Sequence, residues 1–290
     1  MDNKTHFECH GHLCKVNKSN YIRTKLILIG GTNKKSSKAA EISALIFQNS
    51  VLSSIEFLYS FRSPGVVSSP LIDIKDLLLQ NAQQEYAKLS NSISSRLSNK
   101  KLTADFKKDI SPKKLVDYIN EHHQQLIVLG EPETKEIEIS KELIEVNHFL
   151  SRTSCSVLII PESSPAVFPE NAQVISNLSA LNALELLKEH LPFKPDHLRL
   201  TSINQGWPTK SEDKKEILCK KVKEKYYSFL QESFQPKGTD IIILALEKTS
   251  KIPQLELHCL YELCLSSFHV PLLIINPKLI ASESAENNNG

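Results

Sequence analysis

The N-terminal segment concentrates the side chains most able to bind a metal ion. Cys9, His10, His12 and Cys14 fall within six residues. Thiolate and imidazole groups suit zinc, and four such ligands would complete a tetrahedral site. Structural zinc sites normally use two separated pairs of ligands, so a site here would need His6, a distant donor or a second chain. Two alternatives follow: zinc bound by these four residues, or a flexible arm without metal.

A glycine-rich turn is the second candidate for chemistry. Gly30, Gly31, Thr32 and Asn33 follow an apolar run and precede a helical pattern, which is where open α/β folds bind ligands. Backbone N–H groups in such a turn could hold an anion. The turn lacks the full Gly-x-Gly-x-x-Gly pattern, so we interpret it as a tight connection between a strand and a helix. The sequence has no Ser-His-Asp pattern, Walker loop or paired carboxylates, so we predict that the protein is not an enzyme.

An alternation of strands and helices must position these residues. Continuous Val, Ile and Leu runs separated by helical patterns are typical of a parallel sheet with helices on both faces. The expected strands are 25–29, 54–61, 102–110, 125–129 and 156–160, then 173–178, 197–203, 240–246 and 271–275. The expected helical patterns are 39–46, 74–97, 112–119, 143–150, 181–191, 212–234 and 255–265. We therefore predict an α/β fold with two doubly wound parallel sheets in tandem.

The spacing of these elements indicates an internal repeat. Leu126 to Val157 and Ile241 to Leu272 are each 31 positions apart, whereas the second half lacks a counterpart of the third strand and its helix. The predicted parts are an N-terminal arm (1–22), a first domain (23–161), a linker (162–171, ESSPAVFPEN), a shortened second domain (172–278) and a disordered tail (279–290).

The composition limits where in the cell the protein is expected to act and what it is expected to bind. The 290 residues have a formal net charge of +2 and are 40% hydrophobic, which is typical of a soluble globular chain without a strong field for nucleic acid or anionic lipid. No run approaches the roughly 18 apolar residues of a membrane helix, and no secretory signal is recognisable. Four of the six cysteines lie singly in apolar patterns, as reduced cysteines do. We expect a cytoplasmic protein that binds neither membrane nor nucleic acid.

Several segments resemble those of one protein family. They are KLILIGGTN from Lys25, LIVLG from Leu126, SRTSCSVLIIP from Ser151, DIIILAL from Asp240 and FHVPLLIINP from Phe268. Over residues 23–278 the chain resembles a tandem universal stress protein, whose domains have an adenine nucleotide alpha hydrolase-like fold. The resemblance implies that the last strands of the two domains pair, here 156–160 with 271–275, to give a pseudo-dimer within one chain. A homodimer of whole chains is compatible with the same resemblance.

Many members of that family bind ATP through Gly-x2-Gly-x9-Gly followed by Ser or Thr. The residues at the four motif places are Gly130, Glu133, Leu143 and Ile144 in the first half, and Ala245, Lys248, His258 and Cys259 in the second. Only Gly130 matches, and Leu143 and Ile144 would place bulk where phosphate lies. We therefore expect no bound cofactor, with ATP disfavoured and zinc as the alternative. Gly30, Gly31 and Gly130 would line only a vestige of the nucleotide crevice.

The sequence leaves two functions open. The first is a non-enzymatic, cytoplasmic stress-response protein with degenerate nucleotide sites, which acts as a regulatory or scaffolding module for a protein partner. The alternative is a stress sensor that binds a small molecule such as a nucleotide, lipid or metabolite, with or without zinc on the N-terminal arm.

Overall fold

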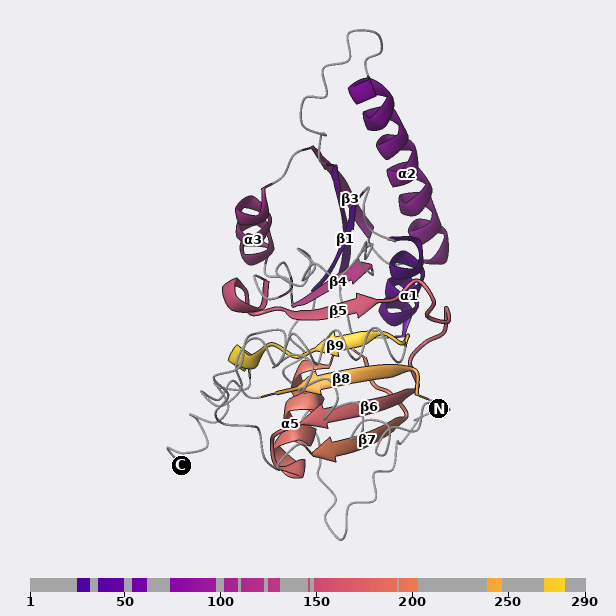
Figure 1. Cartoon of the computed structure of the whole chain (residues 1–290). Helices are drawn as coiled ribbons and strands as arrows, with labels where there is room; N and C mark the ends of the chain where they lie inside the picture. The colour runs from indigo at the N-terminus through magenta and orange to yellow at the C-terminus, as the bar shows by residue number, and fades with distance from the viewer. Residues whose placement is uncertain are drawn as a thin grey trace, which may run out of the picture.

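A single mixed sheet organises the chain (Figure 1). The computed structural model describes residues 25–31, 36–49, 54–61, 74–97, 102–108, 111–122, 125–130, 146, 149–191, 193–202, 239–246 and 269–279. The strands are β1 (Lys25–Gly31), β2 (Ser54–Phe61), β3 (Leu102–Lys108), β4 (Leu126–Gly130), β5 (Ser156–Ile160), β6 (Asn171–Ser176), β7 (His197–Ser202), β8 (Ile241–Ala245) and β9 (Leu272–Ile274). Their order in the sheet is β3-β2-β1-β4-β5-β9-β8-β6-β7. Neighbouring strands are parallel except for β5 and β9.

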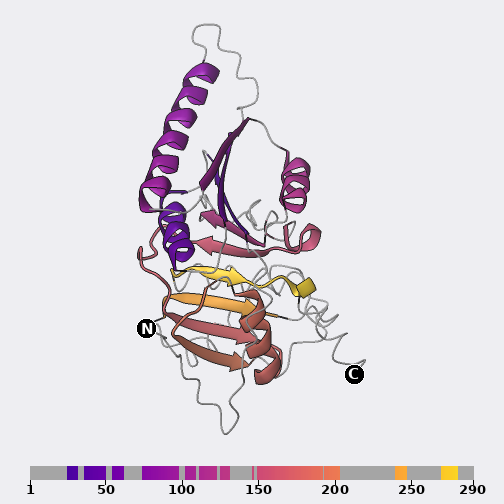
Figure 2. The ribbon, with the colours of Figure 1, turned by 180° about the vertical axis from the view of Figure 1, so that it is seen from behind.

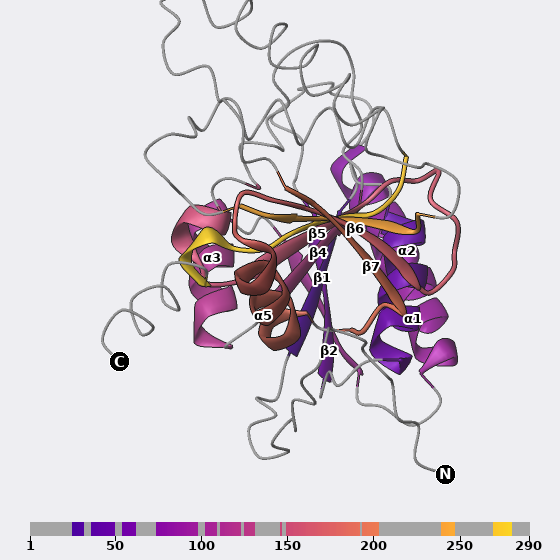
Figure 3. The same ribbon diagram turned by 90° about the horizontal axis from the view of Figure 1, so that it is seen from below.

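Helices cover both faces of this sheet. Helices α1 (Ser36–Gln48) and α2 (Ile74–Arg96) lie on one face of the first five strands, and α3 (Pro112–Glu121) lies on the other (Figure 1). The apolar side chains of α5 (Ala180–His190) join the same core cluster as those of α1 and α2. Residues 149–152 are also helical. Viewed from below, the strands fan around one another (Figure 3), as the right-handed twist of strands requires.

The central strands β1, β4 and β5 are rich in apolar residues because both of their faces are buried. Leu26 and Leu28 of β1 belong to one core cluster, whereas Ile27 and Ile29 belong to the cluster on the opposite face. Every residue of β4 and β5 is buried. The predicted α/β class is thus confirmed, with the difference that the two expected sheets are joined edge to edge into one.

The antiparallel pair β5–β9 makes this join. Three residue pairs, centred on Leu158 and Leu273, connect the two strands. In Figure 2 the yellow β9 and the neighbouring pink β5 run side by side in opposite directions. The resemblance implied that 156–160 would pair with 271–275, and the structure confirms this pairing.

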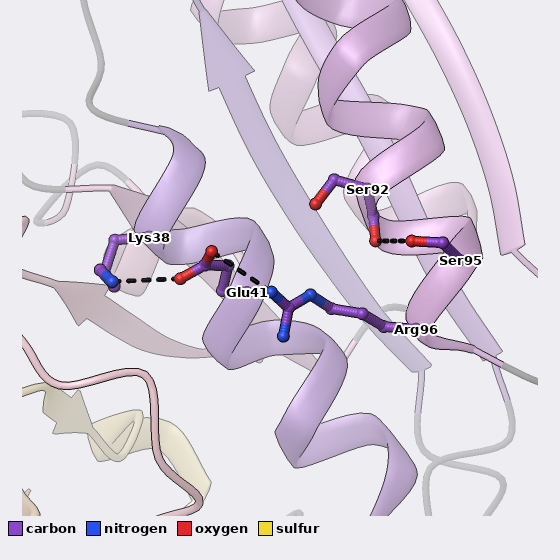
Figure 4. A network of polar contacts seen from close by, with 5 residues as sticks. All are labelled: Lys38, Glu41, Ser92, Ser95 and Arg96. Carbon is purple, nitrogen blue, oxygen red and sulfur yellow. Dashed lines mark hydrogen bonds and ion pairs between the residues drawn. The ribbon is translucent and has the colours of Figure 1, made fainter.

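Polar contacts fix the two helices of the first face to each other. The carboxylate of Glu41 on α1 lies 3.4 Å from Nη2 of Arg96 on α2 and 3.1 Å from Nζ of Lys38 (Figure 4). These groups are partly exposed, so each ion pair contributes only modestly to stability.

An aromatic cluster fills the core beneath α2. Phe57 and Tyr59 of β2, Tyr86 of α2 and Phe106 of β3 have ring centroids 5.6 to 6.3 Å apart in the pairs that touch. The fully buried Tyr59 donates its phenolic hydrogen to Oε2 of Glu85 at 2.6 Å. The cluster therefore contributes both packing and one strong hydrogen bond.

The start of α3 follows from the local sequence. Ser111 is the N-cap, its Oγ accepts a hydrogen bond from the backbone N–H of Lys114 at 3.3 Å, and Pro112 occupies the first turn. Proline is preorganised for that position and lacks an N–H that would need a partner. The predicted helix start is confirmed.

The first strand of the second half, β6, begins at residue 171, two residues before the predicted strand start at 173. One carboxylate oxygen of Asp240 accepts hydrogen bonds from the backbone N–H groups of Glu170 and Asn171 and from the Asn171 side chain, at 2.9 to 3.1 Å. These bonds extend the strand at its start, and the side chain of Ser176 binds the backbone N–H of Leu178 and ends it. The helices expected at 212–234 and 255–265 lie outside the described residues.

Candidate functional site

The point where the chain reverses direction across the sheet is the expected ligand site of an open α/β fold. In the first half this point lies between β1 and β4, because β2 and β3 extend to one side and β5 to the other. Ile29 pairs with Leu129, so Gly30 and Gly130 occupy the next positions at the carboxyl ends of their strands. Gly31 follows as the last residue of β1. The structure thus brings together three glycines that the sequence analysis singled out.

Glycines at adjacent strand ends leave backbone groups without a covering Cβ. Such an arrangement allows a ligand to approach the main chain closely, and N–H groups there could bind an anion. This glycine notch, consisting of Gly30, Gly31 and Gly130, is the candidate site of the first half. Gly130 is buried, so its surroundings already have interior character.

The corresponding point in the second half lies between β6 and β8 and is bridged by the Ser176 side chain. Ser176 at the end of β6 donates a hydrogen bond from Oγ to the carbonyl of Ala245 at 2.7 Å. The same Oγ accepts the backbone N–H of Leu178 at 3.1 Å. The fully buried hydroxyl therefore bridges the two strand ends that a ligand would have to enter.

Strand register shows what replaces Gly130 in the second half. Ile127 pairs with Val157, and Ile242 pairs with Leu272, in agreement with the 31-residue spacing of the two halves. Gly130 comes three residues after Ile127, and Ala245 comes three residues after Ile242. Ala245 is fully buried, so a methyl group takes the place of the glycine hydrogen, and the Ala245 carbonyl is occupied by Ser176.

The remaining predicted site residues lie outside the described part of the chain. They are Cys9, His10, His12 and Cys14 of the N-terminal arm, Glu133, Leu143 and Ile144 of the first half, and Lys248, His258 and Cys259 of the second. Over the described ranges there is no group of three or more His, Cys, Asp or Glu residues that could hold a metal ion. No helix within those ranges is long and apolar enough to cross a membrane. The zinc prediction therefore stays a prediction.

The sequence analysis missed a polar cluster on the face covered by α3. The Tyr118 hydroxyl of α3 donates to Oε1 of Glu56, a β2 carboxylate whose residue is only 8% exposed. Burial, this hydrogen bond and the nearby Glu56 and Asp105 charges raise the pKa of Tyr118. His122 stacks on the Tyr118 ring at 4.0 Å. The sequence feature that could have indicated this cluster is Glu56, a single glutamate within the apolar run of β2.

This cluster also includes a cation. Nζ of Lys107 lies 5.9 Å from the centre of the Tyr118 ring and 2.6 Å from a carboxylate oxygen of Asp105. The Lys107 ammonium group pairs with the Asp105 carboxylate, and the Glu56 carboxylate accepts the Tyr118 hydrogen bond, so both carboxylates have a partner. The cluster is suited to holding α3 on the sheet, and Tyr118 is kept in its neutral form.

The described cysteine is not a nucleophile. Cys155 is buried at 1% exposure, and this burial raises the pKa of its thiol to about 11 despite a hydrogen bond from Thr153 that acts in the opposite direction. Reactive cysteines have a lowered pKa and access to solvent. Cys155 has neither property, in agreement with the core role expected from its sequence context.

Comparison with known proteins identifies the architecture. No family model and no curated protein sequence matches the chain. Among solved structures, a universal stress protein from Archaeoglobus fulgidus has 13% identity and a TM-score of 0.54, over 86% of this chain and 96% of that one. One from Pseudomonas aeruginosa has 10% identity and a TM-score of 0.48, over 90% and 96%. One from Lactobacillus plantarum has 17% identity and a TM-score of 0.38, over 49% and 99%.

Identities at this level establish the fold and nothing finer. The match to the Archaeoglobus fulgidus protein extends over most of both chains, so it includes strands on either side of the β5–β9 junction. The chain described here therefore has the fold of the universal stress proteins.

Proposed function

We propose that the protein is a non-enzymatic member of the universal stress protein family, acting in the cytoplasm as a regulatory or scaffolding module for a protein partner. The observation that carries this proposal is the fold match over 86% of the chain, combined with the second-half strand ends that the Ser176 hydroxyl bridges to Ala245. We infer that this half, with its strand ends bridged in this way, contributes surface and not chemistry.

The register of the β5–β9 junction supports two related domains packed as a pseudo-dimer. Leu158 pairs with Leu273 at the centre of the junction, and the pairs Val157–Ile274 and Ile159–Leu272 flank it. A twofold axis through the central pair would exchange Val157 with Leu272 and Ile159 with Ile274. These are the counterparts that the 31-residue spacing of a duplicated unit would give. We include this tandem arrangement in the proposal.

Loss of nucleotide binding is the part of the proposal most open to experiment. We expect isothermal titration of the full chain with ATP, AMP and cyclic AMP to give no stoichiometric binding at micromolar concentrations. Glu131 directly follows Gly130, and its charge would oppose a phosphate at the notch. Stoichiometric, saturable binding of any of the three nucleotides would contradict the degenerate-site proposal.

A specific observation also favours a second function, a small-molecule sensor. Gly30 and Gly130 occupy adjacent positions at the strand ends of the first half, whereas the Ser176 hydroxyl bridges the strand ends of the second half. Native mass spectrometry of protein taken directly from cells would reveal a bound metabolite as a fixed mass difference. The Gly130→Leu variant would fill the notch with an isobutyl group and should lose that mass. Gly130→Ala adds only the methyl group that Ala245 has in the second half and should retain part of it. If wild-type protein carries no such mass, the scaffold proposal is favoured.

The zinc alternative requires its own measurement. Elemental analysis of untagged protein should be compared with a variant carrying both Cys9→Ser and Cys14→Ser. Stoichiometric zinc in wild type and its loss in the variant would support a metal site on the arm. Equal, negligible zinc in both would exclude it.

A further inference from the structure

Asn276 connects the end of the second half to the first half through its side chain. It is fully buried, and its Nδ2 lies 3.1 Å from the carbonyl oxygen of Leu150 and 3.0 Å from those of Thr153 and Cys155. Its backbone N–H donates to Oγ of Ser156 at 3.3 Å. One amide group thus shares its two hydrogens among three backbone carbonyls of the other half.

These carbonyls need donors because of where they lie. Residues 149–152 end a helix, and the last carbonyls of a helix have no partner within it. Thr153 already binds back to the carbonyl of Phe149 through both its N–H and its hydroxyl. Nζ of Lys278 donates a hydrogen bond to the Thr153 carbonyl at 3.3 Å. The backbone N–H of Lys278 donates to Oδ1 of Asn276. Asn276 therefore caps a helix of the first half and is itself held in orientation.

The opposite end of the junction has a different composition. Leu158 pairs with Leu273, so Asn276, three residues after Leu273, corresponds to Pro161, three residues after Leu158. Pro161 is buried and has neither a backbone N–H nor a side-chain N–H. Near it, the structure describes one side-chain hydrogen bond to the second half, from Oγ of Ser164 in the linker to the His269 carbonyl at 3.4 Å.

We infer that Asn276 selects β9 of the same chain as the partner of β5, in preference to β5 of a second copy. If two copies paired through β5 in the same register, Pro161 of one copy would take the place of Asn276 against the turn at 150–155 of the other. Proline has neither a backbone N–H nor a side-chain donor for the groups there, and buried carbonyls without donors are costly. A single buried amide that specifies register and partner is a known device in helical assemblies.

The experiment combines hydrogen exchange with association of the full chain. In Asn276→Leu, exchange of the β5 amides at 157–159 should accelerate by roughly tenfold or more, while β1 and β2 keep wild-type protection. Two differently tagged copies of this variant should co-purify, whereas tagged wild-type copies should not. In that dimer the amides at 157–159 should be protected again, and those at 272–274 should exchange freely. Asn182→Leu, at an exposed position of α5, is the matched control and should behave as wild type.

Three results would overturn the inference. The first is Asn276→Leu with wild-type protection at 157–159 and no association. The second is a dimer in which both β5 and β9 are protected, because β9 would then have been exchanged between copies. The third is a uniform loss of hydrogen-exchange protection that includes β1 and β2 and occurs both in Asn276→Leu and in the isosteric Asn276→Asp. Asn276 would then stabilise the whole core and would not select the partner of β5.

Discussion

Leu158 and Leu273 lie directly opposite each other across the antiparallel β5–β9 pair, and both are fully buried. Their side chains belong to the core cluster that also includes residues of α1 and α5. The two halves of the chain therefore share one continuous hydrophobic core at this point. A charge placed here would have no partner and no water.

The first prediction follows from that pair. Leu158→Asp or Leu273→Asp should lower the free energy of unfolding by at least about 3 kcal/mol, or prevent folding, because an ionised carboxylate would be buried without compensation. Urea unfolding followed by circular dichroism measures the change. Leu181→Asp is the matched control, since Leu181 is 73% exposed and should tolerate the charge within about 0.5 kcal/mol. Equal stability of all three variants would show that the junction is not part of the core.

The second prediction concerns alkaline pH. Burial, followed by the hydrogen bond to Glu85 and its charge, raises the pKa of Tyr59. A tyrosine whose folded pKa lies above its unfolded value stabilises the protein fully below about pH 10, and this stabilisation is lost as the pH rises further. The free energy of unfolding should thus fall between about pH 10 and 11, and it should fall less steeply in Tyr59→Phe.

Glu85→Gln separates the causes of this shift. Glutamine removes the charge but leaves the burial of Tyr59 unchanged, and burial is the largest cause. Most of the alkaline loss of stability should therefore persist in Glu85→Gln. If the loss disappears with the charge, burial is not the dominant cause.

The third prediction concerns a buried hydroxyl on α1. Ser43 is fully buried, and within the described residues its Oγ has no hydrogen-bond partner. Ser43→Ala should raise the free energy of unfolding by about 0.5 to 2 kcal/mol, because it removes an unpaired polar group and places a better helix former. Ser95→Ala is the control for helix propensity. Ser95 lies on the exposed surface of α2, where its Oγ donates to the Ser92 carbonyl at 2.9 Å (Figure 4). A loss of stability in Ser43→Ala alone would contradict the prediction.

The sequence predicts elements whose causes are local. The runs at 25–29 and 125–129 are apolar at every position after the first, so burial on both faces was the consistent interpretation, and β1 and β4 confirm it. Ser111 and Pro112 predicted the start of α3 because cap chemistry depends on adjacent residues.

Features that depend on distant residues could not be predicted in this way. The start of β6 is displaced by the carboxylate of Asp240, which is far away in the chain. The contact between Glu56 and Tyr118 and the capping of the 149–152 helix by Asn276 likewise require the folded sheet to bring their partners together. Of the candidate site, the sequence named Gly30 and Gly130 but could not establish that they are neighbours, because register is a property of paired strands.

The fourth prediction uses Cys155 as a reporter of the junction. Its thiol is buried beside β5, and burial raises its pKa to about 11, so it is both inaccessible and protonated at pH 8. We expect N-ethylmaleimide to leave Cys155 unmodified in native protein at pH 8 and to modify it at the rate of global unfolding in urea. Mass spectrometry of proteolytic peptides assigns the label to this cysteine independently of the other five. Labelling of native protein that is faster than unfolding would mean that the turn at 150–155 opens locally. Because Asn276 binds the Cys155 carbonyl, Asn276→Leu should produce that faster labelling even where wild type does not.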